Sequence, residues 1–206
     1  DQSVPTVPRE ARAEVIWTRE TGYYPDGTNY ELRRPSFTLS DFAYGPPEKA
    51  LIISPRLAPH MVGLGLLEAI PVEALEAIAD PNDEDGDGIS GRIAWLSTEE
   101  GQLPGRFGWR AEAPTVKSQV IDAFLGDMGL TTSHAPKDTC TDTQEDCLNA
   151  PTGGKPEVSD RILDRVVTYS KTIAVPVRRT PSDRLVLRGK STFHKIKCVA
   201  CHTPSY

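Results

Sequence analysis

Two cysteines and a histidine near the end of the sequence have the types and spacing for covalent chemistry. Cys198 and Cys201 lie three positions apart and His202 follows directly, in the run CVACH. Positions i and i+3 of a helix share one face, so two thiols there can add to the two vinyl groups of a haem while the next imidazole binds the iron. The spacing therefore predicts covalent attachment of haem c at Cys198 and Cys201, with His202 as an iron ligand.

Three other interpretations of this motif stay open. A zinc site needs further Cys or His at metal-ligand spacing, and the other cysteines lie more than fifty residues away. A redox-active, thioredoxin-like pair is favoured by a βαβ setting, which the sequence does not show. The simplest alternative is an unligated or disulfide-bonded pair of cysteines. Gly189 and Phe193 before the motif and Pro204 after it favour haem, because they are similar to the flanks of the haem motif in small cytochromes c.

The second axial ligand of the iron is left open. Cytochrome c domains usually supply a Met or His well downstream, and this sequence ends four residues after His202. A filled sixth position favours electron transfer, and an open one favours chemistry on a small molecule at the iron. His194 is poorly placed because it precedes Cys198 by four residues on the same helix. The internal candidates are Met61, Met128, His60, His134 and His194.

An acidic loop containing glycines, DPNDEDGDGISGR, has the pattern of a calcium site. Asp83, Asp85 and Asp87 alternate along it, and Ile89 could add its backbone carbonyl. The twelfth position is Ala94, where an EF-hand carries a bidentate Glu. We therefore expect a Ca²⁺ site whose last ligand comes from elsewhere; the alternative is a solvated acidic turn. The candidates for that last ligand are Asp80, Asn82 and water.

A second cysteine pair closes a short acidic segment, CTDTQEDC, between Cys140 and Cys147. No buried-helix pattern surrounds it. In an oxidising compartment, cysteines this close are predicted to form a local disulfide, with a pair of free thiols as the alternative. A disulfide agrees with haem c, because both are made outside the cytoplasm.

The composition is that of an ordinary folded protein, and two classes of partner are not expected. The 206 residues are 38% hydrophobic and 25% charged, with a net charge of −6. No basic stripe follows any helix, so nucleic acid is not expected as a partner. No apolar run approaches the roughly 18–20 residues that cross a bilayer, so no membrane span is expected. Residue 1 is Asp and no signal peptide is visible, which indicates a processed or truncated start.

Turn signals and hydrophobic periodicity predict the elements that must position these groups. Two β-prone runs in residues 13–40 flank Pro25-Asp26-Gly27, which predicts a hairpin. Apolar residues at helical spacing predict helices over residues 114–129 and 160–173, the second with Ser159 as its N-cap. Further helices are predicted near residues 61–70, 71–80 and 183–197, with a loop over 131–157 and a linker over 175–182.

Six stretches follow one another along the chain: SPRLAPHMVGLGLLEAIP, DEDGDGISGR, GRFGWRAEAPT, AFLGDMGLTTS, TIAVPVRR and the run around CVACHTP. Taken together, they resemble the bacterial di-haem oxidoreductase family, described as peroxidases or "thiol oxidoreductases" with two cytochrome c motifs. The similarity runs from about residue 13 to the end. It implies an exported, periplasmic protein with two covalent haems c, all-α cytochrome folds and calcium between the haem domains.

The resemblance also implies which residues form the sites. The second haem motif of the family falls on Cys198, Cys201 and His202, and the calcium-like loop falls on Asp83, Asp85 and Asp87. The first C-x-x-C-H motif of the family and the region after the second motif are both missing. The sequence therefore looks like the middle of a longer protein, cut at both ends.

The expected fold is mainly α with a minor β-hairpin region and long loops, containing a cytochrome c-like haem domain that is incomplete at its C-terminus. Residues 1–175 are expected to be a linker or interdomain region with the hairpin, helices and calcium-like loop, as part of a first cytochrome-like domain. Residues 176–206 are expected to begin the second cytochrome c domain, which carries the C-x-x-C-H motif.

The leading functional hypothesis is a c-type, di-haem, peroxidase-like oxidoreductase that moves electrons between haems to reduce peroxide or a similar small oxidant. Its expected partners are an electron-donor protein and the rest of the di-haem protein or a completing chain. One alternative is an electron-transfer cytochrome c without catalytic activity. Another is an exported module, stabilised by calcium and a disulfide, in which haem is structural.

Several other residues have weaker functional interpretations. Glu68, in an apolar run, suits an acid–base group if burial raises its pKa, although an exposed helix edge is the simpler interpretation. Trp95 and Trp109 suit electron relay, although a core or interface position is commoner for Trp. Four arginines suit pairing with haem propionates, and the sequence does not choose among them: Arg56, Arg92, Arg106 and Arg110.

Overall fold

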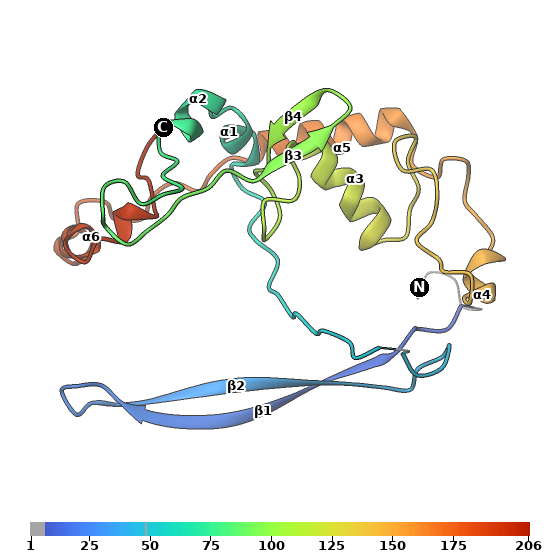
Figure 1. The fold of residues 1–206 in the computed structure, drawn as a ribbon, viewed down its shortest axis with the longest axis horizontal. Coiled ribbons are helices and arrows are strands. Elements are labelled where there is room, and N and C mark those ends of the chain that lie inside the picture. The colour runs from blue at the N-terminus through green and yellow to red at the C-terminus, as the bar shows by residue number, and fades with distance from the viewer. Residues whose placement is uncertain (1–6, 48) are drawn as a thin grey trace.

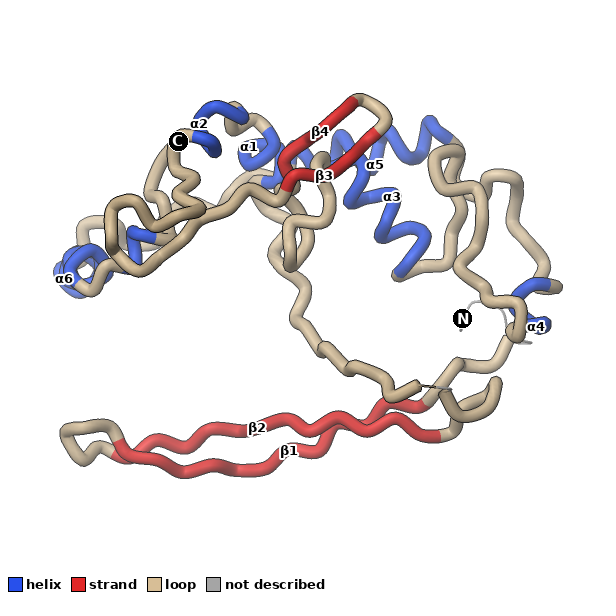
Figure 2. Tube along the Cα trace, in the orientation of Figure 1, coloured by secondary structure: helices blue, strands red, loops and turns tan. Residues whose placement is uncertain are grey.

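The computed structural model describes residues 7–47 and 49–206 of the chain. A long two-stranded hairpin lies along one side, and a body of short helices lies on the other (Figure 1). Extended chain over residues 51–61, without helix or strand, leads from the hairpin to the first helix (Figure 2). The expectation of a mainly α fold is wrong, because the described residues are 27% helix and 18% strand. Long connections and short helices account for the low helix content.

The predicted hairpin is present as β1 (Arg12–Tyr23) paired antiparallel with β2 (Asn29–Ser40). Its turn follows from the residues that link the strands. The Asp26 side chain accepts a hydrogen bond from the backbone N–H of Thr28 at 2.9 Å, and Gly27 has a φ of 86°, which glycine adopts without steric cost. The Asp26–Thr28 bond also lowers the pKa of Asp26, since it favours the charged form.

One face of the hairpin is apolar over part of its length. Because side chains alternate along a strand, the pairs Val15–Phe37 and Trp17–Pro35 lie on this face, and the pair Arg19–Arg33 follows on the same face. Trp17 is 54% exposed, and the guanidinium of Arg33 lies 5.0 Å from its ring centroid. Three exposed ion pairs run along the strands: Arg12–Glu14, Arg19–Glu31 and Arg34–Glu20.

The hydrophobic core lies where α1 (Leu64–Glu68), α3 (Val116–Gly126) and α5 (Asp160–Thr172) meet. Val116 on α3 and Leu163 on α5 are fully buried, and deleting such a leucine side chain typically costs about 2–5 kcal/mol. Both longer helices follow the predicted periodicity. The remaining members of the core cluster are Phe107, Ala113, Val120 and Val158.

The N-termini of the two longer helices are held differently. Thr115 and Ser118 form a capping box on α3, in which each side chain accepts from the backbone N–H of the other residue at 3.0 Å. Ser159 is the N-cap of α5, as predicted, but its side chain makes no capping hydrogen bond. The first turn of α5 carries Asp160, whose negative charge suits the helix N-terminus.

Two glycines at α1 are explained by the local backbone and by packing. Gly63 is the N-cap of α1 with a φ of 76°, in the left-handed region that other residues avoid. At Gly65 an added Cβ would overlap the backbone carbonyl of Lys171 on α5. Glycine therefore allows α1 to approach the α5 backbone closely.

The remaining elements are short, except for the last helix. After α1 comes α2 (Val72–Glu76), and a small second hairpin pairs β3 (Trp95–Thr98) with β4 (Gly101–Pro104). Within the predicted loop 131–157 lies α4 (Glu145–Leu148), and the chain ends with α6 (Arg184–Lys195) and the single 3₁₀ turn η1 (Cys198–Ala200). Across residues 7–47 and 49–206, no helix is long and apolar enough to span a membrane.

Candidate haem site

The predicted haem motif lies at the end of α6, as the sequence pattern indicated. The side chain of Asp183 caps this helix by accepting from the N–H of Leu185 at 2.7 Å. The helix ends at Lys195, and Lys197 has a φ of 61°, a left-handed conformation that turns the chain sharply. This turn starts η1 and brings the cysteines back beside α6.

The 3₁₀ turn brings the two cysteines and the histidine together. The backbone N–H groups of Cys201 and His202 both donate to the carbonyl of Cys198, at 3.3 and 2.9 Å. Both thiols are free; Cys198 is half-buried and Cys201 is exposed. They can therefore react with an external group, whereas a buried disulfide could not.

A cavity of about 640 Å³ lies between α6 and the motif. The imidazole of His202 lines it, and the Phe193 ring lies beside that imidazole with ring centroids 5.8 Å apart. The wall is mainly apolar and combines side chains of α6 with residues on both sides of it. The apolar members are Pro181, Val186, Leu187, Phe193, Val199 and Pro204.

These residues fit a haem. A flat, largely apolar macrocycle needs an apolar wall, and its iron needs an imidazole directed into the same space. No residue of α6 is buried, and Leu187 is 52% exposed although it lines the cavity. A helix with an apolar face left open in this way is ready to pack against a further hydrophobic group.

The candidates for the sixth iron ligand are separated by their positions. Only His194 lines the cavity together with His202, and it projects from the same helix as the motif. Met61 and Met128 are exposed and lie outside the cavity wall. His60 and His134 are likewise not among the lining residues.

None of the four arginines considered for haem propionates lines the cavity. Arg106 donates to the carbonyls of Leu67 and Ile70 at 3.0 and 2.8 Å, so it holds the end of α1. Arg92 donates to the carbonyl of Pro81, and Arg110 pairs with Glu112. Sequence reasoning missed Arg178 and Lys190, which do line the cavity, because only the fold brings the chain before α6 together with one face of that helix.

The acidic loop brings together part of the predicted calcium set. Carboxylate oxygens of Asp80, Asp83 and Asp85 lie within 4.8 Å of one another. Asp80 was a candidate for the additional ligand. Asp87 is not in this cluster, and its carboxylate accepts from the N–H of Ile89 at 2.8 Å.

The same carboxylates shape the loop. Asp80 accepts from the N–H of Glu84 at 2.9 Å, and Asp83 accepts from the N–H of Gly88 at 3.0 Å. Gly86 and Gly88 have φ values of 69° and 85°, in the left-handed region that lets the loop turn sharply.

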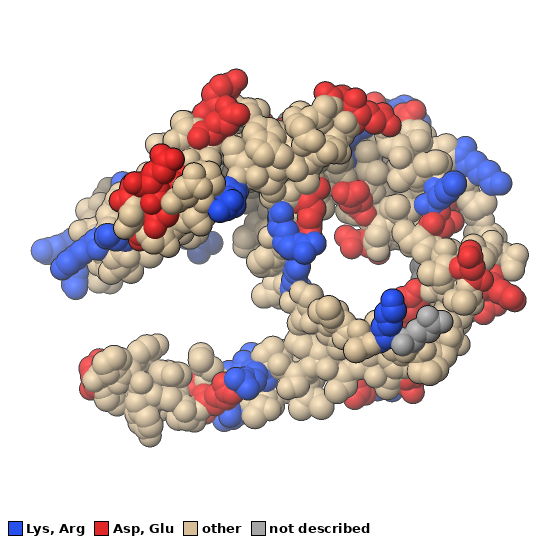
Figure 3. Space-filling model, in the orientation of Figure 1, with Lys and Arg blue, Asp and Glu red and all other residues tan. Residues whose placement is uncertain are grey.

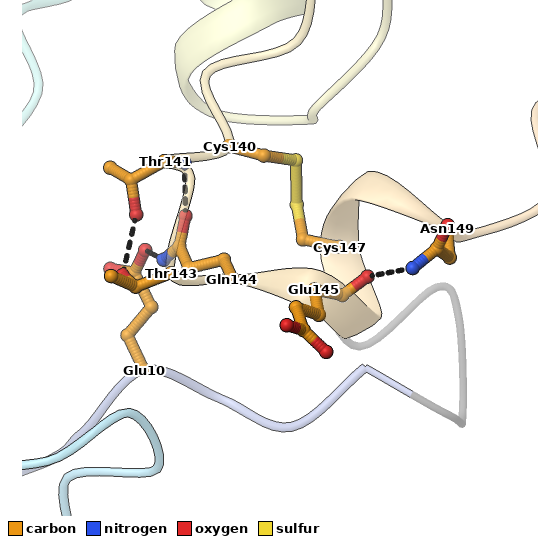
Figure 4. Close-up of a disulfide and its surroundings, with 8 residues drawn as sticks. All are labelled: Glu10, Cys140, Thr141, Thr143, Gln144, Glu145, Cys147 and Asn149. Atoms are coloured by element: carbon orange, nitrogen blue, oxygen red, sulfur yellow. Dashed lines mark hydrogen bonds between the residues drawn. A yellow bond between two sulfur atoms is a disulfide. The ribbon is translucent and has the colours of Figure 1, made fainter.

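The predicted disulfide between Cys140 and Cys147 is confirmed. It joins the chain before α4 to that helix, and Gln144 inside the loop donates to the carboxylate of Glu10 (Figure 4). The backbone N–H of Ala43 donates to the carbonyl of Glu10 at 3.0 Å. The disulfide loop is therefore attached to the base of the long hairpin.

The positions of Glu68, Trp95 and Trp109 differ from those that their simpler interpretations predicted. Glu68 is not on an exposed helix edge: its carboxylate accepts from the N–H of Val116 at 2.8 Å and pairs with Lys171. It links α1 to α3 and α5, away from the cavity. Trp95 and Trp109 are about half exposed, and neither lines the cavity.

Comparison with known proteins gives one finding that agrees with this site. The family model described as "Di-haem oxidoreductase, putative peroxidase" matches residues 6–206, which is nearly the whole chain. No curated protein and no solved structure gives a significant match. The family match and the motif beside the α6 cavity point the same way, and the chain belongs to the di-haem oxidoreductase family.

Proposed function

We propose that this chain binds haem c through Cys198, Cys201 and His202, as part of a di-haem, peroxidase-like oxidoreductase that reduces peroxide or a similar small oxidant. One observation carries the proposal. In a chain of the di-haem oxidoreductase family, two free thiols, Cys198 and Cys201, stand on either side of Val199 in the sequence. Val199 and His202 line a mainly apolar cavity, and the two cysteines themselves are not among its lining residues.

The residues of the chain have separate parts in this function. When bound, the haem supplies a one-electron redox centre. Cys198 and Cys201 would hold the haem through thioether bonds, and His202 would be a ligand of its iron. Val186, Leu187 and Phe193 line the cavity and would shield one face of a bound haem from water. Lower water access and a fixed orientation both tune the reduction potential.

The partners follow from the family. Electrons must come from a donor, for which we propose an electron-donor protein, and they must leave to a small-molecule oxidant. A second haem requires the rest of the di-haem protein or a completing chain. Since haem c and the Cys140–Cys147 disulfide both suit an oxidising compartment, we place the protein in the periplasm or otherwise outside the cytoplasm.

We also propose that the acidic loop binds Ca²⁺. Asp80, Asp83 and Asp85 supply carboxylate oxygens within 4.8 Å of one another, and Ca²⁺ takes six to eight oxygen ligands of this kind. Asp87 and the carbonyl of Ile89 stand next in the loop and complete the predicted set. A bound cation would relieve the repulsion among these carboxylates and stiffen the loop.

The test of haem binding is expression of the full-length native protein in cells that mature c-type cytochromes. A pyridine haemochrome spectrum and an intact mass should report covalent haem. The variant Cys198→Ala/Cys201→Ala should lose one haem, whereas Cys140→Ser/Cys147→Ser should keep the wild-type number. A colourless wild-type protein with the mass of its amino acids alone would overturn the proposal.

A second measurement separates the enzyme from a simple electron carrier. Binding of cyanide to the ferric protein, with a shift of the Soret band, and peroxide-dependent oxidation of a reduced donor are expected of the peroxidase. If neither cyanide nor peroxide changes the ferric spectrum, the protein would be assigned to electron transfer alone.

A further inference from the structure

The cavity beside α6 is cationic as well as apolar. Arg178, from the chain before α6, and Lys190, on α6, both line it, together with His194 and His202. No Asp or Glu is among the lining residues. This local absence of acid contrasts with a chain that has 29 Asp and Glu against 23 Lys and Arg. Figure 3 shows Lys and Arg side chains at the end of the molecule where α6 lies, with Asp and Glu side chains next to them.

The two cations are not engaged elsewhere in the described chain. Within residues 7–47 and 49–206, neither Arg178 nor Lys190 forms an ion pair with a carboxylate. Two of the arginines first considered for propionates do have partners: Arg106 donates to two carbonyls, and Arg110 pairs with Glu112. A ligand that combines a flat apolar body with anionic substituents would use both the apolar wall and these two charges.

We infer that Arg178 and Lys190 are the partners of the haem carboxylates, and that they raise the reduction potential of the haem attached at Cys198 and Cys201. This inference rests on the proposed function. An Arg fork can bind a carboxylate with two parallel hydrogen bonds, and a Lys ammonium can bind it as a point charge. Because reduction adds an electron to the iron, nearby positive charge favours the reduced state. Both cations are exposed, so the effect should weaken with added salt.

The test compares midpoint potentials in the full-length holoprotein. Arg178→Gln and Lys190→Gln remove a cavity cation each, whereas Arg179→Gln and Arg188→Gln remove a neighbouring cation that does not line the cavity. The potential of this haem is identified as the one lost in Cys198→Ala/Cys201→Ala. We expect each cavity variant to lower it by more than either control does, with the largest difference at low salt. Equal shifts in all four variants would overturn the inference.

The outcomes also separate this inference from the proposed function. Wild-type protein without covalent haem would refute the function itself. Wild-type protein with haem but with unchanged potentials in the cavity variants would refute only the roles of Arg178 and Lys190. If Arg178→Gln fails to load haem, loading restored in Arg178→Lys would support a need for the charge. Failure of both, with normal loading in Arg179→Gln, would show a structural role and overturn the inference.

Discussion

The backbone N–H of Val116, at the start of α3, donates to the carboxylate of Glu68 on α1 across 48 positions of sequence, at 2.8 Å. The other carboxylate oxygen pairs with Lys171 on α5. One side chain thus satisfies a free N–H at a helix start and joins the three helices that form the core. Glu68 therefore has a structural role, and it does not line the cavity beside α6.

Removing this carboxylate should destabilise the fold without affecting haem attachment. Glu68→Ala leaves the N–H of Val116 without its partner and breaks the pair with Lys171, which should cost about 1–3 kcal/mol. Glu68→Gln keeps an acceptor for the N–H and should lose less. Urea unfolding measures both, and a pyridine haemochrome spectrum provides the control. Equal stability of Glu68→Ala and wild type would show that the contact does not contribute.

Gly65→Ala should destabilise the contact between α1 and α5. Alanine normally favours a helix over glycine by about 1 kcal/mol, but here the new Cβ would overlap the carbonyl of Lys171. We expect the melting temperature to fall. Gly126→Ala is the matched control, because a Cβ there meets nothing within 4 Å and should leave stability unchanged or raise it. A rise in both variants would contradict the close approach.

Reduction of the Cys140–Cys147 disulfide should lower stability by a modest amount. The cysteines are 7 positions apart, and closing so short a loop is worth about 2–3 kcal/mol in the chain-entropy estimate. Cys140→Ser/Cys147→Ser should match the wild type in reductant by thermal unfolding. Since Gln144 in this loop contacts Glu10, proteolysis near the hairpin base should also be faster. Unchanged cleavage and melting would contradict this anchoring role.

Acid should weaken the segment held by Glu157. Hydrogen bonds from the backbone N–H groups of Thr131 and Gly153 lower the pKa of Glu157 below its ordinary value of 4.5. A carboxylate with a depressed folded pKa stabilises the fold above its unfolded pKa, and this contribution is lost as the pH falls through the folded pKa. Glu157→Gln should therefore lower the melting temperature at neutral pH and flatten its decline below about pH 4.5.

Glu99→Gln is the control for that pH profile. Glu99 is exposed, and within residues 7–47 and 49–206 its side chain makes no hydrogen bond. Its melting temperatures should follow those of the wild type across the range. If Glu157→Gln also followed the wild-type profile, the hydrogen bonds to Thr131 and Gly153 would not control the acid response.

Calcium should raise the melting temperature of the native protein, and a chelator should reverse this. Saturation at about 100 times the dissociation constant corresponds to roughly 2.7 kcal/mol. Asp83→Asn and Asp85→Asn should abolish the response because they remove charged oxygens from the cluster. Asp87→Asn tests whether Asp87 is also a ligand. If calcium no longer raises the melting temperature of this variant, Asp87 belongs to the site. If calcium still raises it, the ligands are limited to Asp80, Asp83 and Asp85. A wild type indifferent to calcium would refute the site.

The sequence predicted those helices and strands that are marked by turn residues or by a hydrophobic period within the element itself. The hairpin followed from alternating side chains around Pro25-Asp26-Gly27, and α3, α5 and α6 followed from apolar residues at helical spacing. The β3–β4 hairpin and α4 were missed, because strands and helices of four residues are too short to show a period. Together with long connections, these short elements made the expected helix content too high.

The candidate site also contains residues that the sequence could predict and residues that it could not. The C-x-x-C-H spacing is local, so Cys198, Cys201 and His202 were visible in the sequence as a group. Contacts between distant segments were not. Glu68 and Val116 lie 48 positions apart, and Arg178 lines the cavity with Lys190 only because a turn and a capped helix place them there.

The long hairpin has a consequence for solubility. Both of its outer edges offer unpaired backbone groups along 12-residue strands, and such edges are templates for strand addition and aggregation. Arg12, Glu14, Arg33 and Arg34 place charge along these edges, and Pro35 removes an N–H donor from β2. These residues act as gatekeepers: an incoming strand would have to bury their charges. The β1–β2 hairpin can therefore be long and exposed without nucleating aggregation.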